Sequence, residues 1–188
     1  MALSKIDVAN MLTGTIPVDN SKSGSILQVQ STFYNTPFTQ SITANTLTGI
    51  DNLTVNITPS STSSKIMLFC RLFCEHSNDV TYETGYFFRR GSTQIGVGVA
   101  EGGRAVVMAS HGVNYMTGSG TYDATSTAET VSLFHIDASH SSTSQITYSI
   151  GYRAVNAGTL AVNRTVNDSD SNLHERGSSE IIAMEIKG

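Results

Sequence analysis

Apolar and polar positions along most of this chain alternate with a period of two. The alternation is cleanest at Leu53, Val55 and Ile57 and along residues 145–154, and residues 65–74 form a nearly continuous apolar run. A period of two indicates a strand with one buried face, and a short continuous run indicates a strand buried on both. Further strands are predicted to open at Leu27 and Val29 and to cover residues 86–90, 93–99, 104–108, 130–136, 159–162 and 180–186.

Turn-forming residues separate these strands. A Pro, Ser and Thr segment joins residues 57 and 65, and Gly91-Ser92 indicates a hairpin turn. Longer polar loops are predicted at residues 77–84, 118–128, 138–144 and 167–179. Eight to ten short strands with turns between them predict an all-β fold, an antiparallel β-sandwich of jelly-roll type spanning residues 25–188.

Residues 1–24 have a different pattern. Apolar residues spaced as on a short helix are followed, after Gly14, by a connector rich in Pro, Ser and Gly. Such a segment cannot bury its apolar side chains alone, so we expect an anchoring arm that docks on another protein. The predicted anchoring residues are Leu3, Ile6, Val8, Met11, Leu12 and Ile16.

The composition narrows the class of partner. Net charge is -4, only 11 residues are Lys or Arg, and they are scattered, which argues against nucleic-acid binding. No apolar run approaches the roughly 18 residues of a membrane-spanning helix, and the N-terminus lacks the layout of a signal peptide. Cys70 and Cys74 lie on one face of a predicted strand, about 13 Å apart, too far for a disulfide, so we expect reduced core thiols.

Two candidate metal sites have simpler interpretations. Residues 168–172 begin like a calcium loop, but Leu173 stands where glycine is required and Ser179 where the loop needs Glu, so a solvated turn is the preferred interpretation. His135 could join its copies in a three-histidine site on a trimer axis, or simply be a packed histidine, which we prefer. No cofactor is predicted.

Catalytic motifs are weak. The chain has no G-x-S-x-G or H-E-x-x-H motif, and its cysteines lie in apolar surroundings that blunt thiol reactivity. Asp79 and Glu83 could form a glycosidase pair only at a separation that the sequence does not specify. We therefore predict a protein that is not an enzyme.

Four segments stand in a fixed order along the chain: Ile57-Thr-Pro-Ser-Ser-Thr-Ser-Ser-Lys-Ile66, Arg90-Gly-Ser-Thr-Gln-Ile-Gly-Val-Gly98, Val162-Asn-Arg-Thr-Val-Asn-Asp-Ser-Asp170 and Ile182-Ala-Met-Glu-Ile186. Together they resemble the C-terminal β-domains of structural proteins from tailed bacteriophages, especially marine and cyanobacterial ones. Residues 3–17 also resemble the N-terminal lead of phage tail-fibre proteins, although no shaft of repeats follows.

This resemblance implies a virion subunit assembled in the host cytoplasm, a short tail fibre or spike that projects a trimeric β-sandwich for attachment to the host surface. The arm would contact a tail adaptor or tube. The alternative is a capsid cement or head decoration protein; a secreted cytokine-like or complement-like trimer and a free lectin or glycosidase rank lower. Multivalent contact with a host-surface glycan is expected. The predicted contacts are Tyr82, Tyr115, Tyr122 and His140.

Overall fold

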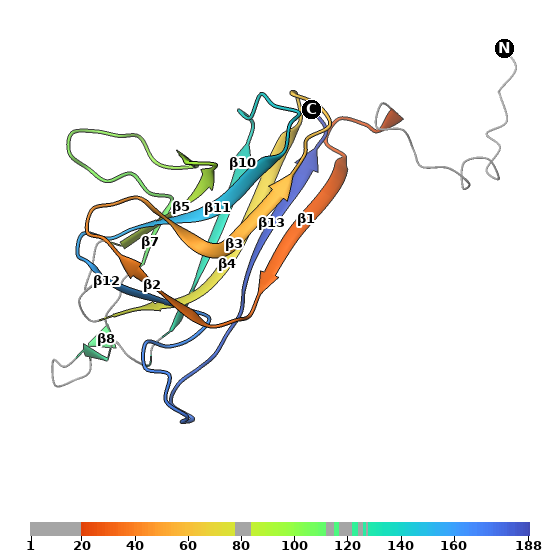
Figure 1. The fold of residues 1–188 in the computed structure, drawn as a ribbon. Helices are drawn as coiled ribbons and strands as arrows, with labels where there is room; N and C mark the ends of the chain where they lie inside the picture. Colours follow the sequence, from red (N-terminus) through yellow and green to blue (C-terminus); the bar gives the residue numbers. More distant parts are fainter. Residues whose placement is uncertain (1–19, 78–83, 112–114, 117–121, 124–125, 127) are drawn as a thin grey trace, which may run out of the picture.

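The computed structural model describes residues 20–77, 84–111, 115–116, 122–123, 126 and 128–188 (Figure 1). Within them the chain is nearly all strand. The strands are β1 (Ile26–Tyr34), β2 (Phe38–Ile42), β3 (Thr48–Ile57), β4 (Lys65–His76), β5 (Thr84–Arg90), β6 (Thr93–Ile95), β7 (Ala109–His111), β8 (Tyr115–Met116), β9 (Tyr122–Asp123), β10 (Glu129–Asp137), β11 (Ile146–Arg153), β12 (Gly158–Val162) and β13 (Ser179–Ile186).

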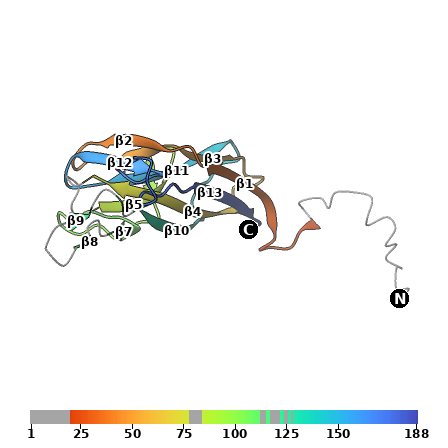
Figure 2. The ribbon, with the colours of Figure 1, turned by 90° about the horizontal axis from the view of Figure 1, so that it is seen from below.

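The strands form two main antiparallel sheets. Sheet A has the order β1-β13-β4-β12-β2, with β10 on the other side of β4, so that β4 is central. Sheet B has the order β3-β11-β5-β6, with β7 also pairing with β5, and β8 pairs with β9 separately. The sheets pack face to face, which confirms the predicted all-β sandwich. In both views β8 lies at the end of the body away from β1 (Figures 1 and 2).

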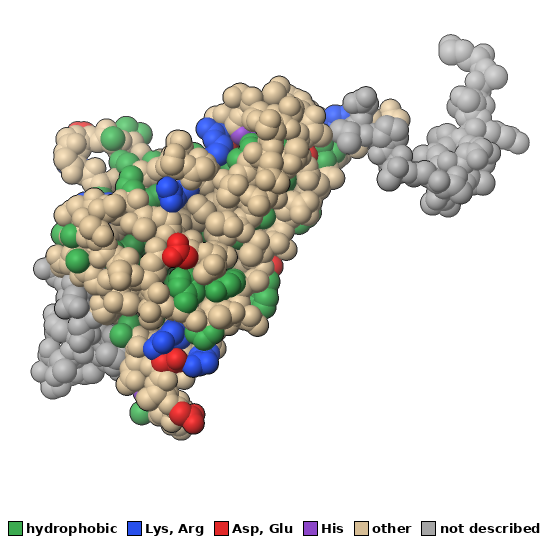
Figure 3. Space-filling view, viewed as in Figure 1, with side chains coloured by type: hydrophobic (Ala, Val, Ile, Leu, Met, Phe, Trp, Pro, Cys, Tyr) green, Lys and Arg blue, Asp and Glu red, His purple; other side chains and the backbone are tan. Residues whose placement is uncertain are grey.

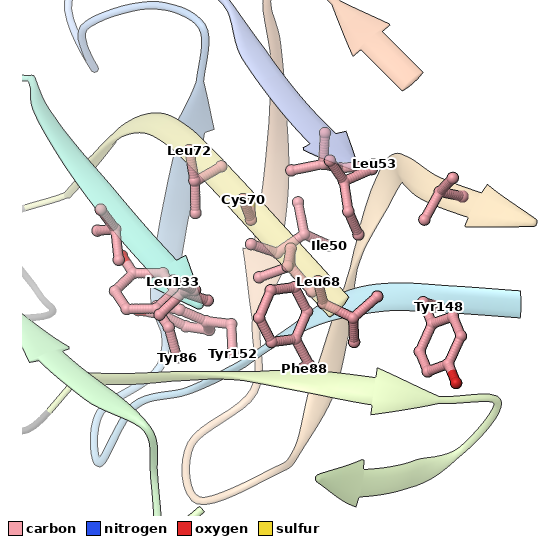
Figure 4. Packing of buried hydrophobic residues seen from close by; sticks show 14 of the residues in the cluster. Ile50, Leu53, Leu68, Cys70, Leu72, Tyr86, Phe88, Leu133, Tyr148 and Tyr152 are labelled. Atoms are coloured by element: carbon pink, nitrogen blue, oxygen red, sulfur yellow. The ribbon is translucent and has the colours of Figure 1, made fainter. Parts of the chain in front are cut away.

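The core lies between the sheets and follows the period of two. Along β4, Ile66, Leu68, Cys70, Leu72 and Cys74 are all buried. They meet buried side chains of β3, β5, β10 and β11, several of which point toward one another in Figure 4. At about 25 cal/mol per Å² of apolar surface buried, this layer is the main source of stability. Both cysteines are free, as predicted, and burial raises the pKa of Cys74 to about 12.

Three strand predictions need correction. Residues 104–108 are not a strand, and the strand begins only at Ala109. The segment is held by three hydrogen bonds: the Gln94 amide donates to the Val106 carbonyl, the Gly98 N–H to the Val107 carbonyl, and the Met108 N–H to the Tyr86 carbonyl. The strand from Thr93 ends at Ile95, because Gly96 has φ +70°. Finally, β2 was missed because its central residues are polar, as an edge strand allows. The Gly91-Ser92 hairpin turn is confirmed.

Lys187 ties the start of the described chain to its end. Its ammonium donates to the Ser21 carbonyl at 2.6 Å, its carbonyl accepts from Gly24 N–H at 2.8 Å, and its N–H donates to Ser25 O at 2.9 Å. The six predicted anchoring residues, Leu3 to Ile16, lie outside the described residues, so their role stays a prediction. Among the residues described, no helix is long and apolar enough to cross a bilayer.

Candidate interaction surface

The outer face of sheet A, which points away from the core, is apolar across four strands. Directly paired residues of antiparallel strands project to the same side, so the register identifies its members. One row crosses the sheet as Val29, Met184, Met67 and Ile136, and the next as Ser31, Ile182, Phe69 and Phe134. We call this surface the apolar face. Its apolar members are Ile26, Val29, Phe33, Met67, Phe69, Phe134, Ile136, Ile182, Met184 and Ile186.

The exposure of this face is unusual for side chains of this kind. Phe33 is 57%, Phe134 52% and Val29 51% exposed. Phe69 and Phe134 form an aromatic pair, with ring centroids 4.9 Å apart. Single exposed apolar residues are common, but a contiguous set across four strands marks an interaction site.

A shallow hollow of about 330 Å³ lies in the apolar face. Phe69, Phe134 and Ile182 form its apolar walls, and Arg71 and Glu180 stand at its edge. Arg71 and Glu180 are themselves directly paired across β4 and β13, which balances the charge there. The hollow therefore suits an apolar knob from a partner that brings little net charge.

Part of the outer face of sheet B, over β5 and β11, is covered by side chains of the same chain. Phe87, on that face, is fully buried, and a Cβ at Gly151 would lie 2.0 Å from its ring. A Cβ at Gly85 would lie 2.1 Å from Val107, because the segment between β6 and β7 packs onto this sheet. In the view of Figure 3, hydrophobic groups appear in separate areas among polar and charged ones. Among the described residues, the contiguous set of exposed apolar side chains lies on sheet A.

A buried ion pair holds the end of the sandwich where β10 ends. Asp137 is 1% exposed, and Nη1 of Arg90 donates to its two oxygens at 3.0 and 2.9 Å. Burial would raise the pKa of the Asp137 carboxyl, but hydrogen bonds from Tyr148 at 2.8 Å and from Ser139, together with the Arg90 charge, hold it below its usual value.

A second buried carboxylate, Glu185, fixes the loop before β4. It accepts hydrogen bonds from the Ser60 N–H at 2.7 Å, the Ser60 and Ser64 hydroxyls at 2.6 Å, and the Gln28 amide at 2.7 Å. Burial pushes its pKa up, yet these donors bring the pKa below its usual value. Both carboxylates are saturated with donors, so their geometry fits a structural role.

The four predicted recognition residues have different outcomes. His140 is only 3% exposed; its Nε2 lies 2.8 Å from the Ser64 carbonyl and its Nδ1 3.2 Å from the Ser142 carbonyl. The expectation that it is a surface contact is therefore wrong, because the ring clamps two loops together. Tyr115 and Tyr122 lie on the paired strands β8 and β9, and Tyr82 lies outside the described residues. For the tyrosines, the role stays a prediction.

The candidate metal ligands have other partners. The Asp168 carboxylate accepts two hydrogen bonds from Arg176, at 3.0 and 2.8 Å, and lies 3.3 Å from Arg164, so arginine holds the place a calcium ion would need. His135 occupies an inward position of β10, where its ring lies against Gly96. No cluster of three metal-ligating side chains occurs among the described residues.

Sequence reasoning missed the apolar face. The only signal was the nearly continuous apolar run of residues 65–74, in which Met67 and Phe69 stand between the core residues.

In comparisons with known proteins, neither a protein-family model nor a curated protein matches this chain.

Proposed function

We propose that this chain is a non-enzymatic structural subunit of a bacteriophage virion, a short tail fibre or spike in which three copies associate through the apolar face and present the rest of the sandwich to the host surface. The observation that carries this proposal is the apolar face itself. An antiparallel sheet normally turns polar residues to water, so this face is suited to a partner. The phage assignment rests on the resemblance of the four segments described above.

A second copy of the chain is the occupant that fits best. The six most exposed side chains of the face present on the order of 500 Å² of apolar surface, taking 150–250 Å² for an aromatic ring. A standard interface buries roughly 800 Å² per partner, with an apolar centre and a polar rim. The pairing of Arg71 with Glu180 leaves little net charge to repel an identical face.

The arrangement of knob and hollow supports a ring of copies. Phe33 projects from β1 at one edge of the face, whereas the hollow lies between β10, β4 and β13. Because knob and hollow lie on different strands, a knob of one copy can enter the hollow of the next. Head-to-tail contacts form a closed ring when the rotation between copies closes, and the proposal is a ring of three.

The strand order supports the jelly-roll part of the proposal. With β2, β6, β8, β9 and β12 set aside and the three-residue β7 kept, sheet A has the order β1-β13-β4-β10 and sheet B the order β3-β11-β5-β7. Each sheet then has four strands, and the first strand lies beside the last. This is the arrangement expected of two Greek keys wound into a jelly roll.

Antibody labelling of intact particles tests the proposed location. An antibody against the full chain, viewed by electron microscopy on particles of the phage that encodes it, should label the tail end. Label spread over the head would favour the cement protein instead, and particles without label would contradict a virion role altogether.

A further inference from the structure

A second hollow, also of about 330 Å³, differs from the first in its lining, which is mostly polar. It is formed where the β5–β6 hairpin meets the loop from β10 to β11. Its lining is rich in hydroxyl and amide groups, and Arg90 is its one side chain that always carries a charge. The residues that matter here are Arg90, Gly91, Ser139, Ser141, Gln145 and Thr147.

Arg90 presents a fixed row of donors to this hollow. Within the described structure, all its hydrogen bonds use Nη1, which contacts both Asp137 oxygens and the Ser139 hydroxyl at 3.3 Å. Nε and Nη2 therefore have no hydrogen-bond partner among the described residues, and the side chain is 27% exposed. Because Asp137 holds the guanidinium in place, little rotamer entropy is lost when a ligand binds.

The rest of the lining adds unused polar groups and open space. Ser141 and Gln145 are exposed, and among the described residues their side chains make no hydrogen bond. Gly91, at φ +59°, leaves nothing within 4 Å of the place where a Cβ would stand. A ring-shaped ligand can therefore approach the backbone beside Arg90.

The charge balance selects the class of ligand. Asp137 neutralises Arg90, so the hollow offers directional donors and acceptors without surplus positive charge. An anionic ligand gains little there, whereas neighbouring hydroxyls of a sugar can accept from Nε and Nη2 and bond with Ser141 and Gln145. The geometry points to a binding site for a neutral sugar unit with adjacent hydroxyls. This inference rests on the proposed function, because the hollow would be the surface that contacts the host glycan. Weak single sites become firm when three act together.

Saturation-transfer NMR on the full-length protein tests the site. The probes are the methyl glycosides of glucose, galactose and mannose, with glucuronate as the acidic comparison. At least one neutral glycoside should bind, and the double variant Ser141→Ala/Gln145→Ala should weaken its affinity at least tenfold. The matched control Thr39→Ala/Ser41→Ala removes two exposed hydroxyls from β2 and should leave binding unchanged.

Three results would overturn the site: binding of none of the neutral glycosides, equal binding to the lining variant and the wild type, or binding of glucuronate alone. The failure is distinguishable from failure of the proposed function, which depends on assembly and location. If the chain forms trimers and the antibody labels the virion, but no neutral sugar binds, only the proposed sugar site is wrong and the proposed function stands.

Discussion

Phe69 and Phe134 lie on neighbouring strands β4 and β10 with their ring centroids 4.9 Å apart, yet the two residues are 37% and 52% exposed. They are directly paired in the register, as are Met67 and Ile136 two residues along. An aromatic pair of this kind contributes about 0.5–1.5 kcal/mol beyond the burial of its area, and full burial would add the transfer term. A partner that covered the two rings would therefore gain the free energy of burying their exposed apolar area.

Replacing Asp137 with Asn should destabilise the folded chain. The substitution leaves Arg90 without its charged partner and weakens the bonds from Tyr148 and Ser139, so the free energy of unfolding should fall by about 2–4 kcal/mol. Urea unfolding followed by circular dichroism measures the change. Asp51→Asn, at an exposed position of β3, is the control and should change stability by less than about 0.5 kcal/mol. Equal effects of the two would contradict the structural role of Asp137.

Stability should decrease in acid. The pKa values of Asp137 and Glu185 are lower in the folded state than the ordinary values of about 3.9 and 4.3, so the unfolded state binds protons first as the pH falls. The stabilisation is complete above about pH 5 and is lost as the pH falls through the ordinary and then the folded pKa values. Urea midpoints at pH 7, 5 and 3 should therefore be similar for the first two and clearly lower for the third.

The double variant Asp137→Asn/Glu185→Gln is the control for this pH dependence. It should be less stable at pH 7 and should lose less stability between pH 5 and pH 3 than the wild type. A wild-type midpoint that does not change with pH, or a double variant with the full pH dependence, would show that other groups determine the acid response.

Gly96 and Gly98 form a matched pair of glycines two residues apart. A Cβ at Gly96 would lie 2.2 Å from Met108 Cε and 2.9 Å from the His135 ring, and its φ is +70°. Gly96→Ala should therefore cost about 1–3 kcal/mol. A Cβ at Gly98 meets nothing within 4 Å, so Gly98→Ala should be neutral or stabilise the chain by up to about 1 kcal/mol. Thermal unfolding compares them, and equal midpoints would contradict the packing at Gly96.

Much of the fold follows from local pattern. The alternation at residues 53–57 and 145–154 corresponds to β3 and β11, and the Gly91-Ser92 turn joins β5 to β6. Residues 104–108 were misassigned, because Val107 covers Gly85 on the outside of sheet B while the segment joins no ladder of strand hydrogen bonds. An apolar pattern reports partial burial, which a covering loop also has.

The candidate surfaces were harder to predict. In residues 65–74 both sides of the strand are apolar, so a period of two does not distinguish the core side from the side of the apolar face.

His140 lies in a polar loop, yet the carbonyl that its Nε2 contacts belongs to Ser64, 76 positions away. Contacts across such separations depend on the register of the sheets, which a single sequence does not specify.

The mass of the full-length chain in solution tests the central claim most directly. Multi-angle light scattering should give the wild type three times the 20.0 kDa of one chain. The variant Phe134→Glu/Ile136→Glu, which places two charges on the apolar face, should give one chain mass with an unfolding midpoint close to that of the wild type. The control Thr54→Glu, at an exposed position of β3, should keep the wild-type mass. A wild type that runs as a single chain, or a double variant that keeps the full mass, would contradict assembly through the apolar face.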